Sequence, residues 1–122
     1  MRQAGILAAA GIVALEQMVE RLAEDHENCK RLADGLADYP QIEVDVDRVV
    51  TNIVNFSIHN AQQQRLSDTE TRQFLARIRE HGVLMGTMGE GVIRAVTHYG
   101  VDADDISAAL AGIRRALIDM QV

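Results

Sequence analysis

One stretch organises the expected fold of this chain, and it reads GVIRAVTHYG, residues 91–100. Its residues alternate as in a β-strand, which places Val92, Arg94, Val96 and His98 on one face. The other face is expected to carry Ile93, Ala95, Thr97 and Tyr99. An arginine in the middle of an apolar strand is costly unless an anion meets it. The stretch therefore predicts a strand whose Arg94 needs an anionic partner.

The composition is that of an ordinary globular domain. The 122 residues are enough for one domain with a real core. Only 3% of the residues are aromatic, so that core must be aliphatic. There are 12 basic residues against 18 acidic ones, and the net charge of -6 argues against a nucleic-acid-binding module. The single cysteine, Cys29, excludes an intrachain disulfide and fits a reducing, cytoplasmic location.

The first 18 residues are unusually apolar, with no charge from Gln3 to Leu15. A membrane-spanning helix needs about 20 such residues, so this run is too short. A signal peptide would use Arg2 as its basic start, but the small residues lie inside the apolar run and not after it. We interpret the segment as a helix that another chain or domain must cover. Whether it continues straight into the next helix stays open.

Residues 19–37 have the period of an amphipathic helix, which Tyr39 and Pro40 end. Its apolar face is expected to carry Leu22, His26, Cys29, Leu32, Ala33 and Leu36. His26 and Cys29 are three residues apart, a spacing that permits metal binding, but no second pair of ligands lies nearby. We interpret both as core residues and predict no metal site.

The elements expected after residue 40 are strands over 41–47, 51–58, 83–85 and 91–98, a helix over 68–81 and a helix from Asp102. Ser67 and Glu70 have the spacing of a capping box for the first of these helices. The glycines at 86, 89 and 91 are interpreted as a hairpin and not as a phosphate loop, because no helix follows them directly.

This order of elements predicts an α/β fold of the two-layer α+β kind. A small, mostly antiparallel sheet of three or four strands would have helices on one face, after a long N-terminal helical segment. The other face of the sheet would then need a ligand or another domain. The residues supply little catalysis of their own, since Lys30, the single lysine, lies on the solvated side of its helix, whereas a Schiff-base lysine needs a desolvated pocket.

Four segments resemble the C-terminal part of the low-specificity L-threonine aldolases, in the β-eliminating lyase/threonine aldolase group of fold-type-I pyridoxal-phosphate enzymes. They read MRQAGILAAAG (1–11), VERLAEDH (19–26), TNIV (51–54) and IRAVTH (93–98). The resemblance runs in order over essentially the whole chain, and the first and last segments are the most specific.

The resemblance implies an enzyme that cleaves L-threonine or L-allo-threonine to glycine and acetaldehyde with pyridoxal phosphate. Residues 1–18 would be an interdomain or oligomerisation helix, and residues 19–122 the small C-terminal domain. A large domain before Met1 would carry the Schiff-base lysine, so no catalytic residue is expected here. The fragment alone is expected to be inactive, without bound cofactor, and to form a homo-oligomer.

By the same resemblance, Arg94 would bind the α-carboxylate of the substrate. Arg2 would lie near the cofactor phosphate, reaching the site of a neighbouring subunit, and His98 would support the strand. Three alternatives stay open. Arg94 could be paired with a structural acid, Arg2 could lie in a frayed terminus, and the chain could be a free-standing, non-catalytic oligomerisation or ligand-binding module.

Overall fold

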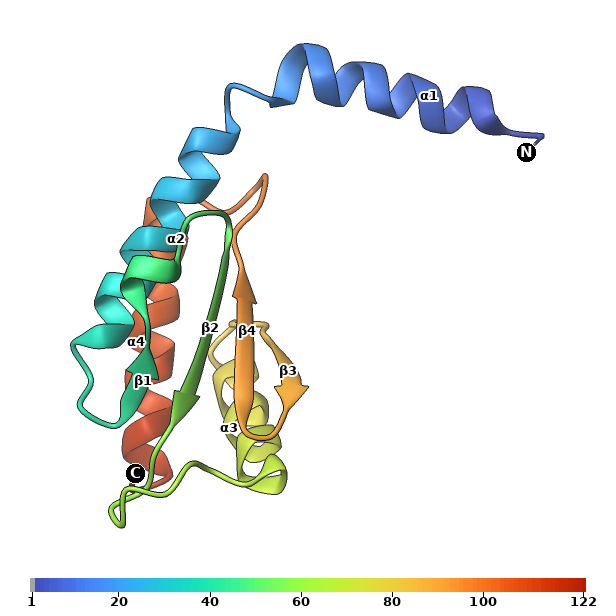
Figure 1. Ribbon diagram of the computed structural model, residues 1–122. Helices are drawn as coiled ribbons and strands as arrows, with labels where there is room; N and C mark the ends of the chain where they lie inside the picture. Colours follow the sequence, from blue (N-terminus) through green and yellow to red (C-terminus); the bar gives the residue numbers. More distant parts are fainter. Residues whose placement is uncertain (1) are drawn as a thin grey trace.

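The computed structural model describes residues 2–122 and has two layers, a sheet and a set of helices on one of its faces (Figure 1). The sheet contains β1 (Ile42–Val44), β2 (Ile53–Ile58), β3 (Gly86–Gly89) and β4 (Val92–Val96) in the order β1-β2-β4-β3, and every pair is antiparallel. The helices of the second layer are α2 (Leu22–Ala37), α3 (Asp68–Glu80) and α4 (Ala103–Asp119). The predicted fold class is confirmed.

The core lies between the sheet and these helices. Strand β4 contributes Ile93 and Ala95, which are 1% and 3% exposed, and β2 contributes Val54, Phe56 and Ile58. From the helices come Cys29, Leu32, Leu36, Phe74, Ile78, Ile106, Ile113 and Leu117. All of these helices pack on one face of the sheet. Among residues 2–122 the other face carries no helix, and we call it the open face.

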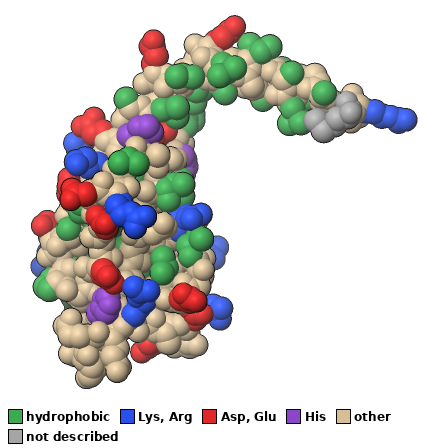
Figure 2. Space-filling view, viewed as in Figure 1, with side chains coloured by type: hydrophobic (Ala, Val, Ile, Leu, Met, Phe, Trp, Pro, Cys, Tyr) green, Lys and Arg blue, Asp and Glu red, His purple; other side chains and the backbone are tan. Residues whose placement is uncertain are grey.

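Helix α1 (Ala4–Val13) stands apart from both layers, and none of its residues is buried. It continues as a π-helical turn (Ala14–Met18), after which the chain bends before α2, so that α1 points away from the domain (Figure 1). Figure 2 shows hydrophobic side chains along this arm. Ile6, Leu7 and Leu15 are 62–75% exposed. The question left open by the sequence is settled, since the two helices are separate.

The helix starts predicted at Ser67 and Asp102 are confirmed, whereas the helix predicted from residue 19 begins at Leu22. Ser67 Oγ accepts a hydrogen bond from the Glu70 amide, and the Glu70 carboxylate accepts one from the Ser67 amide, which completes a capping box for α3. Asp102 and Asp105 form the same arrangement at α4. Each box satisfies backbone amides that have no partner inside the helix.

The expected third strand at 83–85 is wrong. Residues 83–85 form no strand, and pairing with β4 begins at Gly86 and runs to Gly89. Val83 and Met85 instead pack partly against the core. The turn at Glu90, between Gly89 and Gly91, joins β3 to β4, so the predicted hairpin is confirmed with its first strand three to four residues later.

Two face assignments are also wrong. Leu22 and His26 of α2 are exposed, and the buried stripe contains Asp25 and Asn28 in their place. Tyr99 is 71% exposed and does not continue the buried face of β4. Both differences arise from one polar network at the end of β4, described below.

Candidate functional site

Arg94 lies on the open face, in the middle of β4. The alternation predicted for this strand is confirmed from Val92 to Thr97, since Ile93, Ala95 and Thr97 are buried and Val96 is exposed. Asn55 of β2 is the cross-strand partner of Arg94 on one side and Gly86 of β3 is its partner on the other. Among the described residues, no helix covers the face of the sheet on which Arg94 lies.

Arg94 makes one hydrogen bond to another side chain. Its Nε donates to Oδ1 of Asn55 at 3.3 Å. Among residues 2–122, no carboxylate lies within ion-pair distance of its guanidinium. The two terminal nitrogens, which are the best donors for a planar anion, are thus left free by the described side chains.

Strand β1 carries an acid, Glu43, which pairs with Ser57 in the ladder. Its Oε2 accepts hydrogen bonds from the Ser57 hydroxyl at 3.0 Å and from Arg65 Nη2 at 3.2 Å. The Ser57 hydroxyl first, and then Arg65, hold the pKa of Glu43 below its ordinary value. Asn55 and Arg65 also line a hollow of about 190 Å³ with this carboxylate. Glu43 is therefore engaged by its own partners and does not neutralise Arg94.

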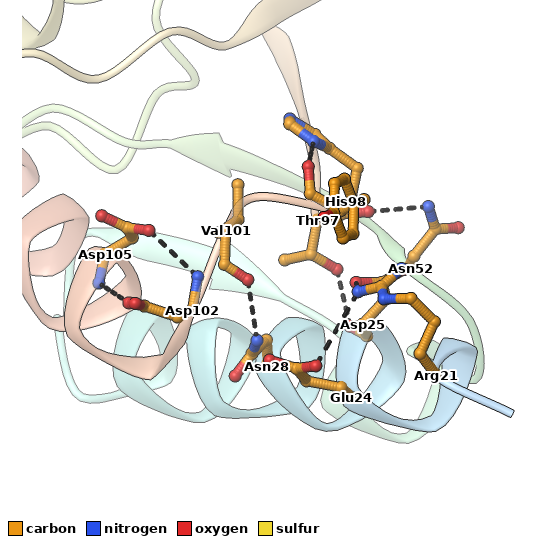
Figure 3. A network of polar contacts seen from close by, with 11 residues as sticks. Arg21, Glu24, Asp25, Asn28, Asn52, Thr97, His98, Val101, Asp102 and Asp105 are labelled. Carbon is orange, nitrogen blue, oxygen red and sulfur yellow. Dashed lines mark hydrogen bonds and ion pairs between the residues drawn. The ribbon is translucent and has the colours of Figure 1, made fainter. Parts of the chain in front are cut away.

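A polar network fixes the end of β4 against α2 (Figure 3). The Thr97 hydroxyl donates to the backbone carbonyl of Asp25 at 2.6 Å. Asn52 Nδ2 donates to the Thr97 carbonyl at 2.8 Å, and the Thr97 amide donates to the Asn52 carbonyl at 3.0 Å. Thr97 is thus bonded from both neighbouring elements, and this sets the position of the strand that carries Arg94.

The same network contains a bidentate ion pair. Arg21 donates to the two carboxylate oxygens of Asp25 at 2.9 and 2.7 Å, and its guanidinium carbon lies 5.1 Å from the centre of the Tyr99 ring. Hydrogen bonding from Arg21 holds the pKa of Asp25 below its ordinary value, although burial acts in the opposite direction. This pairing explains why Asp25 is buried and why Tyr99 turns outward over Arg21. The i,i+4 spacing of Arg21 and Asp25 was the signal for it.

His98 lies beyond the end of β4 and is exposed. Its Nδ1 donates to the carbonyl of Tyr99 at 2.7 Å. With His81 and Asp105 it lines a cavity of about 350 Å³ beside the start of α4. The contact is local to the loop, which agrees with the structural role predicted for His98, and that role stays a prediction.

The structure does not bring the two predicted site arginines together. Arg2 is exposed at the far end of the α1 arm, whereas Arg94 lies on the sheet (Figure 1). Lys30 is exposed on α2, on the covered side of the sheet, so it does not face Arg94 either. Cys29 is buried and His26 is exposed, and residues 2–122 contain no group of three or more metal-binding side chains.

Two residues beside Arg94 were missed from the sequence. Asn55 and Gly86 are separated from it by 39 and 8 residues, and only the strand register makes them its neighbours. The one signal for Asn55 in the sequence is that it is a polar residue inside the expected strand 51–58. No local signal indicates Gly86, because the sequence predicts a hairpin loop at that position.

Solved structures identify the fold as one that occurs in pyridoxal-phosphate enzymes. A C-DES mutant with glycine covalently linked to its PLP cofactor matches 90% of this chain and 28% of its own, with a TM-score of 0.67 and 22% identity. Oryza sativa TDC with PLP and tryptamine matches 84% of this chain and 24% of its own, with a TM-score of 0.68 and 20% identity. A transaminase with L-Ala reaches a TM-score of 0.71 at 18% identity, over 94% of this chain and 27% of its own. At these identities the likeness shows the fold alone.

Curated relatives show which enzymes this chain resembles in sequence. Low-specificity L-threonine aldolase 1 of Arabidopsis thaliana is 32% identical over 121 residues, which are 99% of this chain and 32% of the relative. The low specificity L-threonine aldolase of Escherichia coli is 32% identical over 117 residues, 96% of this chain and 31% of the relative. Residues 1–59 match the family model for Beta-eliminating lyase. The resemblance inferred from the sequence is confirmed, and the chain spans about a third of the length of these relatives.

No helix in residues 2–122 is long and apolar enough to cross a membrane. This includes α1, the most apolar element, which has only ten residues.

Proposed function

We propose that this chain is the substrate-carboxylate portion of a pyridoxal-phosphate-dependent lyase that cleaves L-threonine or L-allo-threonine to glycine and acetaldehyde. One observation carries the proposal. Arg94 lies on an open sheet face without an acidic partner among residues 2–122, in a chain that is similar to threonine aldolases over 99% of its length. An unpaired guanidinium in this setting is a site for an external anion.

Arg94 is proposed to bind the α-carboxylate of the amino-acid substrate. A planar guanidinium offers two parallel donors to a carboxylate, and each charge-assisted hydrogen bond contributes about 1.5–3 kcal/mol. A fixed carboxylate in turn fixes the orientation of the bond to be cleaved. Pyridoxal phosphate, when bound, supplies the electron-accepting ring for that cleavage.

The described residues do not fit a complete cofactor site. A lysine would have to face the open side of the sheet, and the single lysine of the chain, Lys30, lies on α2 behind it. We infer that the residues that hold the cofactor belong to a larger domain encoded before Met1. The span of the chain, about a third of its relatives, supports this division. Within residues 2–122, Arg2 is the one residue that we propose to reach the cofactor phosphate, and its position on a projecting arm suits a site in a neighbouring subunit.

We further propose that residues 1–18 are an interdomain and oligomerisation helix and that residues 19–122 form the small domain. The apolar side chains of α1 are exposed here, and such a surface needs a partner in water. A homo-oligomer that buries α1 is the expected state. Leu7→Glu together with Leu15→Glu should reduce the mass measured by light scattering. A stable monomer of the unaltered protein at high concentration would contradict this part of the proposal.

The decisive test of the function uses the complete protein, expressed with any reading frame that continues upstream of Met1. With pyridoxal phosphate and L-threonine, it should release glycine and acetaldehyde in equal amounts. Arg94→Ala should lower kcat/KM by at least about 100-fold, because two charge-assisted bonds are lost. A stop codon directly upstream, with a stable short product that does not turn over threonine, would favour the free-standing binding module instead.

A further inference from the structure

Arg94 has two cross-strand neighbours on the open face, and they differ in kind. Asn55 and Gly86 both stand directly opposite it in the ladder, one on β2 and the other on β3. Side chains in such positions share a face and have Cβ atoms about 4.5–5.5 Å apart. One side of Arg94 therefore has a polar side chain within reach, and the other side has none.

On the β2 side, Asn55 fixes the guanidinium without neutralising it. Its Oδ1 accepts from Nε of Arg94 at 3.3 Å. An amide is a neutral acceptor, whereas an aspartate here would form an ion pair and neutralise the charge of Arg94. Because Nε already donates to Asn55, a carboxylate ligand would bind the edge of the guanidinium formed by its two terminal nitrogens.

On the β3 side, Gly86 is a glycine that the described chain does not require. A Cβ added at Gly86 would meet nothing within 4 Å, and its φ is not in the left-handed region. Of the seven glycines in residues 19–122, it is the one for which neither crowding nor a positive φ explains the residue. Glycine weakens a strand, and an unexplained strand glycine often marks the close approach of a ligand or of another backbone.

The hairpin offers a direct contrast. Gly91 has a φ of +73°, and an added Cβ would collide with the carbonyl oxygen of Leu66. Its amide also donates to Asp68 Oδ1 at 2.9 Å. Contacts within the chain therefore account for the glycine at position 91. At Gly86, five residues earlier, no such contact exists, and the space beside the residue is empty.

We propose that Asn55 and Gly86 complete the carboxylate site of Arg94. Asn55 is a positioning residue that holds Nε, and Gly86 leaves open the side on which the α-carboxylate and α-carbon of the amino acid lie. This inference rests on the proposed function and extends it to two residues that determine how the substrate fits.

The test introduces Gly86→Ala and Gly86→Val into the complete enzyme. Gly86→Ala should keep the thermal stability of the parent, because the added Cβ meets nothing within 4 Å in the chain. KM for L-threonine should rise by at least about tenfold for Gly86→Ala and further for Gly86→Val, with a smaller change in kcat. Met88→Ala, on the same strand but not paired with Arg94, should leave KM unchanged.

Two competitive inhibitors separate the space beside Gly86 from the charge of Arg94. Glycine carries the carboxylate, and glycinamide has nearly the same size without that negative charge. The inhibition constants of both should rise in Gly86→Ala, because the added methyl takes up space that both need, whereas in Asn55→Asp that of glycine should rise more than that of glycinamide. No change for either inhibitor in Gly86→Ala would overturn the role of Gly86. A change in subunit assembly at unchanged KM would also overturn it, since the space would then belong to another chain.

Asn55 is tested by a pair of substitutions. Asn55→Asp should raise KM more than Asn55→Ala does, because an aspartate would pair with Arg94 in place of the substrate. Equal or absent effects would overturn the positioning role. If Arg94→Lys raises KM while the Asn55 and Gly86 variants do not, this inference fails and the proposed function stands. If the parent enzyme does not cleave threonine, both fail.

Discussion

The two faces of β4 teach different things about this chain. The covered face, with Ile93 and Ala95, is packed by helices that the same chain supplies. The open face, with Arg94 and Val96, has neither cover nor an acidic partner among residues 2–122. The first face is explained by stability. We propose that the second face is explained by a ligand that binds to it. The following experiments test that division from the largest expected effect to the smallest.

The covered face should account for stability. Ile93→Ala removes a side chain that is 1% exposed, and it should lower the free energy of unfolding by about 2–5 kcal/mol. Val96→Ala, on the same strand but 47% exposed, should cost less than about 1 kcal/mol. Urea denaturation followed by circular dichroism measures both. Equal losses would show that the open face is packed in solution and would break the comparison.

Two glycines of the β3–β4 hairpin, Gly91 and Gly86, should differ in the same way in their contribution to stability. Gly91→Ala forces a left-handed φ on an alanine and collides with Leu66, so it should cost about 1–3 kcal/mol of unfolding free energy. Gly86→Ala should be neutral within about 0.5 kcal/mol or slightly stabilising. Thermal unfolding of the two variants side by side checks this, and a large loss for Gly86→Ala would mean that this position is structural.

The fold was predictable where its signals are local. Alternation placed β4 and its two faces, and Ser67 with Glu70 located the start of α3, because capping needs only neighbours in the sequence. The start of β3 was not predictable in this way. Its pairing with β4 begins at Gly86, opposite Arg94. That register depends on both strands together and cannot be read from either strand alone.

The proposed site was predictable only in part for the same reason. Arg94 could be identified from its strand and from the resemblance to threonine aldolases. Asn55 and Gly86 could not, since they meet Arg94 through the ladder. The buried face of α2 was misjudged because Asp25, an acid, is buried by its ion pair with Arg21 and by the contact of Thr97 with its carbonyl.

The network at the end of β4 should give the smallest effect, visible as a pH dependence. The pKa of Asp25 is lower in the folded state, mainly through its hydrogen bonds to Arg21. Its contribution to stability is therefore present above its ordinary pKa of 3.8 and is lost as the pH falls through the folded value. Asp25→Asn should flatten the stability curve below about pH 4. Asp34→Asn, an exposed acid on the same helix, is the control, and an identical curve for both variants would contradict the assignment.

The central claim is that Arg94 binds the substrate carboxylate, and the most direct measurement is the KM of the complete enzyme for L-threonine after Arg94→Lys. A lysine keeps the charge but loses the second parallel donor, so KM should rise by at least about tenfold. Affinity for pyridoxal phosphate should change by less than about twofold, since cofactor and carboxylate are bound by different residues. Arg77→Lys, on the exposed side of α3, should change neither. A KM for Arg94→Lys equal to that of Arg77→Lys would contradict the claim.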